Sequence, residues 1–431
     1  MKKILFILYT CCILLFPVSA QQIPSFKAND RIVFLGNSIT EGGHYHSYIW
    51  LYYMTHFPEL PLRIYNGGIG GDCASHMVFR FDSDIKIKKP TYLVCSFGMN
   101  DSGYDGYNKP GYDKYANKQV EYANTEFGKL QQQILADKKI KNVVLLGSSP
   151  YDENVKLEGV ETLHGKNETI KRIIEMQAEV AQKRGWGFVN FNTVMCELNK
   201  EIQQSDSTAT FCGGDRIHPD KDGHMVMAYL FLKAQGLAGK EVAYFHINAT
   251  NRKAMEERNC RITHIKNEND TISFSYLSRS LPFPVDTIPR WGTKGTARDA
   301  VRQVPFMQEM NQEIMKVTDL HGNFRVTIDG TEIGRWDGNE LSKGINLAEI
   351  TCTPQYQQSL SIMYLNEERC AIEKRLRQYM AMQYVFFKHR GLLFADNKAA
   401  LDAAKAERES HYLVKYLYTN YTQAMFPQIR E

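Results

Sequence analysis

The stretch Arg31-Ile32-Val33-Phe34-Leu35-Gly36-Asn37-Ser38 predicts the fold of this chain. The residues from Ile32 to Leu35 form a short uninterrupted apolar run, which is typical of a buried β-strand. Gly36 ends the run, because glycine favours turns and breaks regular structure. Ser38 therefore lies where a strand passes into a helix, with its hydroxyl at the carboxyl end of the strand.

The same pattern predicts four more short strands, at residues 62–65, 92–95, 142–146 and 187–189. Amphipathic stretches of helical length separate them, such as 115–134 and 167–184. Strands that alternate with helices favour a parallel sheet with helices on both faces. Ligand sites in such sheets lie at the carboxyl ends of the strands. We therefore predict an α/β fold whose site includes Ser38.

A base and an acid for that serine occur about 180 residues further on, in Asp215-Arg216-Ile217-His218. A serine hydroxyl is a weak nucleophile until a histidine removes its proton. The histidine is held in one tautomer by a carboxylate on its other ring nitrogen. Because Asp215 and His218 share one loop, little chain entropy is lost in bringing them together. We expect the rate to rise with pH as His218 loses its proton.

Two glycine-containing segments between these motifs supply candidate donors for an oxyanion hole. They are Gly70-Gly71-Asp72 and Gly98-Met99-Asn100-Asp101. Ser38 and Gly71 each offer a backbone N–H, and Asn100 offers a side-chain amide. Loss of one such donor costs roughly a hundred- to a thousand-fold in rate. The four segments together predict a nucleophilic hydrolase.

From Ile32 to about Leu237 the chain resembles the SGNH hydrolase superfamily, also called the GDSL lipases and esterases. The resemblance implies a three-layer, flavodoxin-like parallel sheet. It implies Ser38 as nucleophile, Gly71 and Asn100 in the oxyanion hole, and His218 as base oriented by Asp215. It implies neither a cofactor nor a metal. Many members carry aspartate before the serine, whereas this chain carries Asn37, which still makes the hydrogen bonds of a turn.

The first twenty residues are typical of a bacterial secretory signal. Lys2 and Lys3 precede an apolar run, and Val18-Ser19-Ala20 provides small residues for cleavage. We therefore expect a periplasmic or secreted protein. A lipoprotein attached through Cys11 is less favoured, because most of the apolar run follows that cysteine. No later run is long and apolar enough to span a membrane.

Charge and cysteine content give few further clues to partners. Without Lys2 and Lys3 the formal charge falls from +4 to +2, which gives no reason to expect nucleic-acid binding. Seven cysteines remain after the signal, with scattered spacing and no zinc-binding pattern. Their number is odd, so at least one is unpaired, and the simplest interpretation is buried apolar residues with one disulfide at most.

The second half of the chain has a different character. We place a signal peptide at 1–20, a catalytic α/β domain at 21–247, and a β-rich module followed by two long helices at 248–431. Residues 262–276 and 323–336 predict hairpins, the second around Asp329-Gly330. Residues 355–389 and 397–423 have helical spacing. The sequence leaves open whether these helices pack on the first domain or contact another molecule.

Four aromatic residues near the motifs are candidates for binding substrate. His44 and His46 follow Ser38 closely and either line the site or lie at a solvated helix start. Tyr104 and Tyr107 lie in a glycine-rich loop, where tyrosines either stack on sugar rings or simply belong to the turn.

The fold alone does not fix the substrate. The chain lacks an apolar lid-like segment near the site, and the β-rich module suits a bulky polar partner. We therefore favour an esterase that removes O-acetyl groups from a carbohydrate, acting on an acylated small molecule or polysaccharide. A lipid or aryl ester hydrolase is the alternative. A non-catalytic carbohydrate-binding protein is disfavoured by the complete set of motif residues.

Overall fold

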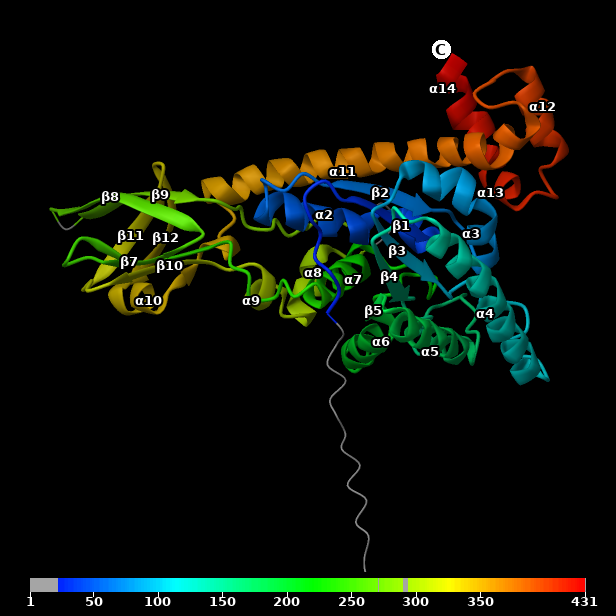
Figure 1. Cartoon of the computed structure of the whole chain (residues 1–431). Coiled ribbons are helices and arrows are strands. Elements are labelled where there is room, and N and C mark those ends of the chain that lie inside the picture. Colours follow the sequence, from blue (N-terminus) through cyan, green and yellow to red (C-terminus); the bar gives the residue numbers. More distant parts are fainter. Residues whose placement is uncertain (1–21, 270, 290–293, 431) are drawn as a thin grey trace, which may run out of the picture.

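The computed structural model describes residues 22–269, 271–289 and 294–430, so the predicted signal peptide at 1–20 lies outside the described residues. An α/β region and a β-rich region lie side by side (Figure 1). The long helix α11 (Pro354–Ala381) begins beside the β-rich region and runs along the α/β region. Within the described ranges, no helix combines the length and the apolar character needed to cross a membrane.

Five parallel strands form the sheet of the α/β region, in the order β2-β1-β3-β4-β5. The predicted three-layer, flavodoxin-like architecture is thus confirmed. In this order the strand sequence reverses direction between β1 and β3, and sites in such sheets form outside the carboxyl ends of the strands at that point. The strands are β1 Arg31–Gly36, β2 Arg63–Gly68, β3 Tyr92–Phe97, β4 Asn142–Gly147 and β5 Gly187–Asn190.

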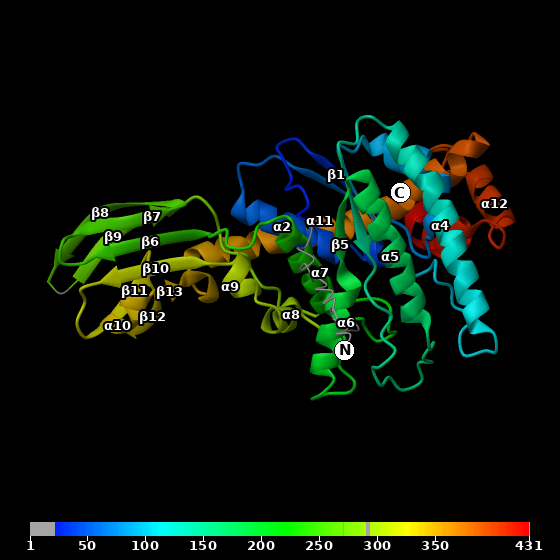
Figure 2. The same cartoon turned by 60° about the horizontal axis from the view of Figure 1, so that its bottom comes forward.

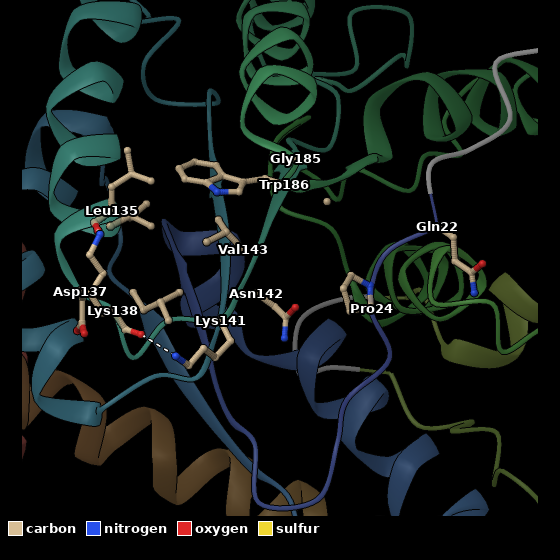
Figure 3. A pocket seen from close by; sticks show the side chains of 13 residues that line it. Gln22, Pro24, Leu135, Asp137, Lys138, Lys141, Asn142, Val143, Gly185 and Trp186 are labelled. Carbon is tan, nitrogen blue, oxygen red and sulfur yellow. Dashed lines mark hydrogen bonds between the residues drawn. The ribbon is translucent and has the colours of Figure 1, made fainter.

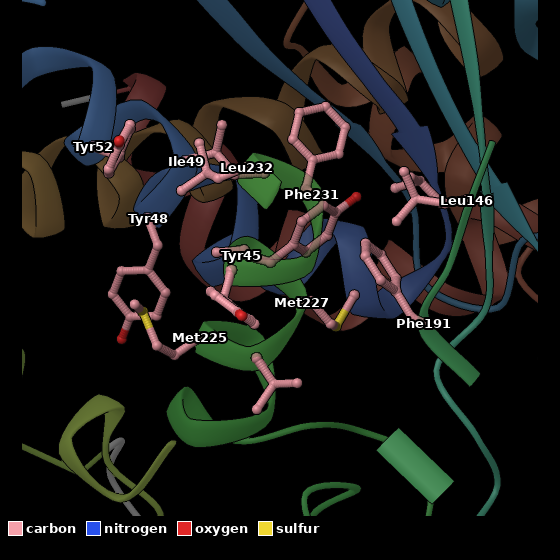
Figure 4. Packing of buried hydrophobic residues seen from close by; sticks show 14 of the residues in the cluster. Tyr45, Tyr48, Ile49, Tyr52, Leu146, Phe191, Met225, Met227, Phe231 and Leu232 are labelled. Atoms are coloured by element: carbon pink, nitrogen blue, oxygen red, sulfur yellow. The ribbon is translucent and has the colours of Figure 1, made fainter. Parts of the chain in front are cut away.

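Helices cover both faces of this sheet, which explains the uninterrupted apolar run in β1. Ile32 and Phe34 pack in one core and Val33 and Leu35 in the other. Figure 4 shows the first core, where aromatic residues of α2 meet the methionines and Phe231 of α7. The first face carries α2 (His44–His56), α6 (Phe191–Ile202) and α7 (Lys221–Ala234), and the second carries α3 (Ala74–Arg80) and α4 (Tyr112–Ala136), with α5 (Lys166–Arg184) beside α4.

The β-rich region contains both predicted hairpins, β8 (Cys260–Glu268) with β9 (Thr271–Ser278) and β11 (Asn323–Ile328) with β12 (Thr331–Asp337). It also contains a four-stranded sheet, β13-β10-β6-β7, that we did not predict. Its first strand begins on the N-terminal side of residue 248. These strands are β6 Ala243–Asn248, β7 Lys253–Arg258, β10 Glu313–Thr318 and β13 Ile345–Asn346.

The C-terminal helices differ in part from the prediction. The first predicted helix corresponds to α11, but residues 397–423 contain two helices, α12 (Lys398–Ala406) and α13 (Tyr412–Asn420), before α14 (Phe426–Arg430). The chain turns between α12 and α13, where His411 N donates to Glu407 O at 3.0 Å. The turn brings apolar residues of α13 against the aromatic residues that follow α11. Tertiary packing thus overrides the helical spacing.

The C-terminal helices pack back on the α/β region, which settles the question that the sequence left open. In both views of the molecule α11 lies beside α2 (Figures 1 and 2). Asn366 of α11 donates its side-chain amide to the carbonyl and the hydroxyl of Ser47 in α2, at 3.1 and 2.9 Å. The core against α2 and α7 also includes Phe283, Phe306 and Met363. Residues 21–247 therefore leave part of their own core to be completed by the second half.

The described residues contain neither a disulfide nor a group of side chains suited to hold a metal ion. All seven described cysteines are unpaired thiols. In the described ranges no group of three or more His, Cys, Asp or Glu side chains is placed to hold a metal ion.

Glu313 of β10 gives the β-rich region a pH-dependent stability. Its carboxyl group is fully buried and accepts a hydrogen bond from Tyr276 Oη at 2.8 Å, and burial raises its pKa to about 7. Between its ordinary pKa and about 7, the folded protein holds a proton that the unfolded chain has lost, so stability falls as pH rises through this window. When the pH rises from 4.5 to 8, the free energy of unfolding of the wild type should fall by about 2 to 3 kcal/mol relative to that of Glu313→Gln, which has no proton to lose. Urea unfolding of both proteins at both pH values measures this change. A difference between variant and wild type that is the same at the two pH values contradicts the expectation.

Candidate active site

Ser38 lies at the first position of α1 (Ser38–Gly42), directly after β1. Asn37 caps this helix, because its side-chain oxygen accepts a hydrogen bond from Ile39 N at 3.0 Å. Asparagine thus fills the capping role at the position where many SGNH sequences carry aspartate. Ser38 Oγ lies 2.7 Å from His218 Nε2, so the structure brings together the two motifs that are 180 residues apart.

Asp215 orients His218 from the same loop. Asp215 Oδ2 lies 2.5 Å from His218 Nδ1, and Oδ1 accepts the backbone N–H groups of Ile217 and His218, each at 2.9 Å. Burial by itself raises the pKa of Asp215, but the hydrogen bonds from His218 outweigh it and the pKa lies below its ordinary value. The carboxylate is therefore ionised at neutral pH and favours the tautomer of His218 whose Nε2 accepts the serine proton.

Arg216 fixes the loop that carries these two residues. Its backbone has a φ of +69°, which is uncommon for a residue with a side chain, and the side chain is buried. The guanidinium donates to the carbonyl oxygens of Asp152 and Val155, at 3.1 and 2.5 Å, and Asp152 N donates back to Arg216 O at 3.0 Å. These contacts tie the His218 loop to the segment after β4. No pattern in the sequence predicts this role of Arg216.

Gly71 lies in a tight turn at the carboxyl end of β2. Asp72 N donates to Ile69 O at 3.2 Å and closes the turn, and Gly71 has a φ of +79° at its third position, where glycine is favoured. Gly71 is exposed to solvent. Within the described ranges its N–H donates to no protein acceptor. This N–H is therefore available to an oxyanion.

Asn100 follows β3, and its amide has a fixed orientation. Its Nδ2 donates to Asp72 O at 3.0 Å, and its Oδ1 accepts from Tyr104 Oη at 2.8 Å. A carbonyl oxygen only accepts, so the amide nitrogen must face Asp72 and one N–H remains for a ligand. Asp101 holds the same loop, because its carboxylate accepts from Ala74 N at 2.7 Å and Gly98 N at 2.9 Å.

Lys166 of α5 donates hydrogen bonds to the loop at residues 99–103, which contains Asn100. Its side chain is fully buried, and Nζ donates to Met99 O, Ser102 Oγ and Gly103 O at 2.8, 2.6 and 2.6 Å. The same ammonium lies 3.8 Å from the centre of the Tyr104 ring. Burial lowers the pKa of Lys166 to about 7, against the pull of the nearby Asp101 charge. A lysine in the first turn of an amphipathic helix gave no sequence signal of this role.

The four predicted substrate-binding residues have different positions. His46 is fully buried, its ring stacks on Phe34, and burial lowers its pKa to about 4, so it is a core residue. Tyr107 is also buried and donates to Ser102 O at 2.7 Å. His44 is partly exposed at the start of α2 beside His224. Tyr104 is partly exposed, and its hydroxyl contacts Asn100, a proposed oxyanion donor.

Tyr104 offers a test that separates two roles. Replacing it by phenylalanine keeps the ring, and hence any stacking on a substrate, but removes the hydroxyl that fixes the Asn100 amide. We expect Tyr104→Phe to lower kcat about 10-fold and to leave KM nearly unchanged, because an oxyanion donor acts mainly in the transition state. Steady-state kinetics on p-nitrophenyl acetate measures this. Tyr112→Phe, at the exposed first position of α4, is the control, and an unchanged kcat in Tyr104→Phe contradicts the expectation.

Two hollows in the described residues lie away from Ser38. The larger, of about 430 Å³, lies at the amino ends of β4 and β5 (Figure 3), on the opposite edge of the sheet. The smaller, of about 220 Å³, lies beyond the end of β4 and includes Asp152 and Cys196. His218 and Asp215, in contrast, have side chains that are 43% and 50% exposed. The Ser38 site is thus open to solvent on its histidine side.

Comparison with known proteins places the chain in a family. A family model described as GDSL-like lipase/acylhydrolase matches residues 34–226, and one described as diltiazem deacetylase C-terminal helical domain matches residues 360–431. A solved structure of a gut microbial diltiazem-metabolizing enzyme is 48% identical, with a TM-score of 0.89, over 95% of this chain and 93% of that one.

Two more distant relatives match about half of the chain. An acetylxylan esterase from Geobacillus stearothermophilus is 22% identical over 224 residues, which are 48% of this chain and 95% of that protein. A solved structure of a catalytic mutant of such an esterase from the same organism is 20% identical over 49% of this chain and 96% of that one, with a TM-score of 0.39. The full-length match at 48% identity, together with the family model and the parallel sheet, shows that the chain belongs to the GDSL-like acylhydrolases of the SGNH superfamily and is an ester-bond hydrolase.

Proposed function

We propose that this hydrolase cleaves acetate esters, with Ser38 as its nucleophile. The observation that carries the proposal is the chain of contacts from Ser38 Oγ to His218 Nε2, at 2.7 Å, and from His218 Nδ1 to Asp215, at 2.5 Å. A serine, a base and an orienting carboxylate at hydrogen-bond distance are the parts of a nucleophilic acyl transfer.

The proposed reaction has two halves. His218 Nε2 takes the proton of Ser38 as Oγ attacks the ester carbonyl, and the N–H groups of Ser38, Gly71 and Asn100 stabilise the oxyanion. Collapse breaks the bond to the alcohol, which leaves with the proton from His218. Water then attacks the acetyl-enzyme, again with His218 as base, and acetate is released. Asp215 stabilises the histidinium in both halves without itself taking the proton.

The names of two relatives support acetate as the acyl group. The family model matched by residues 360–431 is named for a deacetylase, and the distant α/β relative is named an acetylxylan esterase. The two names share the acetyl group and differ in the alcohol. A long-chain lipid ester is therefore the less favoured substrate.

The alcohol is proposed in two classes. The first class is an acetylated carbohydrate, which the sequence favours. The exposure of His218 on one side of the site leaves room for such a bulky polar alcohol. An acetate of a bulky aromatic alcohol is the second class. The relative that is named for metabolizing diltiazem supports this second class, because it is 48% identical and matches 95% of this chain.

A panel of esters tests the proposal. We expect p-nitrophenyl acetate to be cleaved faster than the butyrate and much faster than the octanoate, with acetate released from acetylated xylo-oligosaccharides or from diltiazem. Equal or higher kcat/KM on the octanoate contradicts the acetyl preference. The ratio of kcat/KM for the acetylated xylo-oligosaccharides to kcat/KM for diltiazem decides between the two classes of alcohol.

A further inference from the structure

The C-terminal helices reach the turn that carries Gly71. Tyr416 of α13 lies against Gly70, such that a Cβ atom added to Gly70 would lie 2.3 Å from Cζ of the tyrosine ring. Gly70 does not have a positive φ. Glycine is therefore required at position 70 by the close approach of this ring rather than by backbone conformation.

Glu41 connects this tyrosine to the turn and to the helix of the nucleophile. It lies in α1, three residues after Ser38, and its side chain is only 3% exposed. Its Oε2 accepts from Gly70 N at 2.9 Å and from Tyr416 Oη at 2.6 Å. Its Oε1 accepts from Gln378 Nε2 of α11 at 2.9 Å. One buried carboxylate thus joins α1, the turn at residues 69–72 that carries Gly71 (the oxyanion turn), and the C-terminal helices α11 and α13.

The donors that hydrogen-bond to the Glu41 carboxylate are all neutral groups. In the described part of the chain no lysine, arginine or histidine forms an ion pair with it. The hydroxyl of Tyr416 makes the shortest of its three hydrogen bonds. A buried carboxylate that loses a donor must find another one, protonate or move. Movement of Glu41 displaces Gly70 N and, with it, the neighbouring N–H of Gly71.

A second contact holds the helix that follows the turn. The ring of His76 in α3 stacks on that of Tyr412 in α13, with 4.1 Å between centroids and an angle of 1° between planes. In addition, Arg377 of α11 donates to Gly68 O at 3.1 Å, at the end of β2. The C-terminal helices therefore contact the end of β2, the turn at Gly70 and the helix α3 that follows it.

We propose that Tyr416 is a positioning residue for the oxyanion hole, acting through Glu41 on the Gly70-Gly71 turn. The inference rests on the proposed function, in which the N–H of Gly71 stabilises the oxyanion. It assigns to the C-terminal helices a part in the chemical step, although in the described ranges none of their side chains forms a hydrogen bond with Ser38 or His218.

Tyr416→Phe keeps the ring against Gly70 and removes only the hydroxyl. We expect kcat for p-nitrophenyl acetate to fall roughly 5- to 20-fold, with KM changed less than about twofold, because the oxyanion forms only on the way to the transition state. Binding of phenylboronic acid, which forms a tetrahedral adduct with a nucleophilic serine, is expected to weaken by a similar factor. Glu41→Gln should have a comparable effect, and Tyr416→Phe should add little to it in the double variant.

Tyr379→Phe is the matched control. Tyr379 Oη also donates to a carboxylate at 2.6 Å, that of Asp396, but within the C-terminal helices and away from the turn. It should leave kcat unchanged even where it lowers the unfolding temperature. Equal kcat in Tyr416→Phe and wild type, or an equal fall of kcat in Tyr379→Phe, overturns the inference. Failure of the proposed function is seen separately, as wild-type turnover that does not depend on Ser38.

Discussion

Replacing Ser38 by alanine is expected to lower kcat for p-nitrophenyl acetate by about 10⁴-fold or more. The hydroxyl 2.7 Å from His218 Nε2 is the atom that attacks the ester in the proposed reaction, and alanine offers no substitute. The residual rate should reflect only the oxyanion donors and substrate binding. The fold should be kept, because Ser38 Oγ forms no other hydrogen bond with the residues that the structure describes, and the α1 cap comes from Asn37.

A fluorophosphonate probe provides the direct measurement. It should label the wild type once, at Ser38, and leave Ser38→Ala unlabelled, while circular dichroism and the unfolding temperature stay the same. Ser149→Ala is the control, since it removes a buried serine hydroxyl at the end of another strand of the sheet. Turnover by a folded Ser38→Ala within 10-fold of wild type would show that another residue is the nucleophile.

The sequence predicted the parts of the molecule that are encoded locally. The apolar run before Gly36, the later strands and both hairpins each depend on residues that are neighbours in the chain. The loop from Asp215 to His218 belongs to this class too, because both partners lie within one turn. The order of the motifs along the chain then predicted which strand ends meet, since all of them follow strands of one parallel sheet.

The supports of the site could not be predicted in this way, because their partners are far apart in the chain. Tyr416 meets Glu41 across 375 residues, and Arg377 meets Asp84 across 293. A lone tyrosine or arginine on a helix has no pattern that names such a partner. The central sheet of the β-rich region was missed for a similar reason. Its parallel pair, β6 with β10, brings together segments that are about 70 residues apart.

His46 and Tyr107 show the opposite error. Their closeness in sequence to Ser38 and Asn100 suggested contact with substrate, yet one turn of helix or loop was enough to direct each side chain into the interior. His46 bonds the carbonyl of Thr40 at 3.2 Å, and Tyr107 that of Ser102. Sequence proximity to a nucleophile therefore does not show which way a side chain points.

Arg80→Met is expected to cause the largest loss of stability among the substitutions considered. The guanidinium is fully buried between two carboxylates, with Nε 2.6 Å from Asp72 Oδ2 and Nη1 2.5 Å from Asp84 Oδ2. It also donates to the carbonyl oxygens of Gly36 and Gly67, at the ends of β1 and β2. Breaking a buried pair leaves an uncompensated charge, which typically costs about 3 to 5 kcal/mol. Asp84 keeps Lys88 and Arg377, so the cost falls mainly on Asp72.

The pH dependence of this loss identifies its cause. Burial raises the pKa of Asp72 to about 7 even though Arg80 opposes the shift, so without Arg80 the pKa must rise further. The folded variant then keeps a proton on Asp72 at pH values where the unfolded chain has lost it. Stability falls with rising pH across that window, and the loss in Arg80→Met should be larger at pH 8 than at pH 5.

Urea unfolding of three variants at both pH values tests this account. Arg80→Met combined with Asp72→Asn should recover part of the loss and most of its pH dependence, because the stranded carboxylate is gone. Lys398→Met, which breaks an exposed pair with Asp402, should cost less than about 1 kcal/mol at either pH. If Arg80→Met lowers the free energy of unfolding no more than Lys398→Met does, the buried pair of Arg80 and Asp72 does not stabilise the fold. If instead the loss of stability in Arg80→Met is large but equal at the two pH values, its cause is the lost packing and the lost hydrogen bonds to Gly36 and Gly67. The charge on Asp72 is then not the cause.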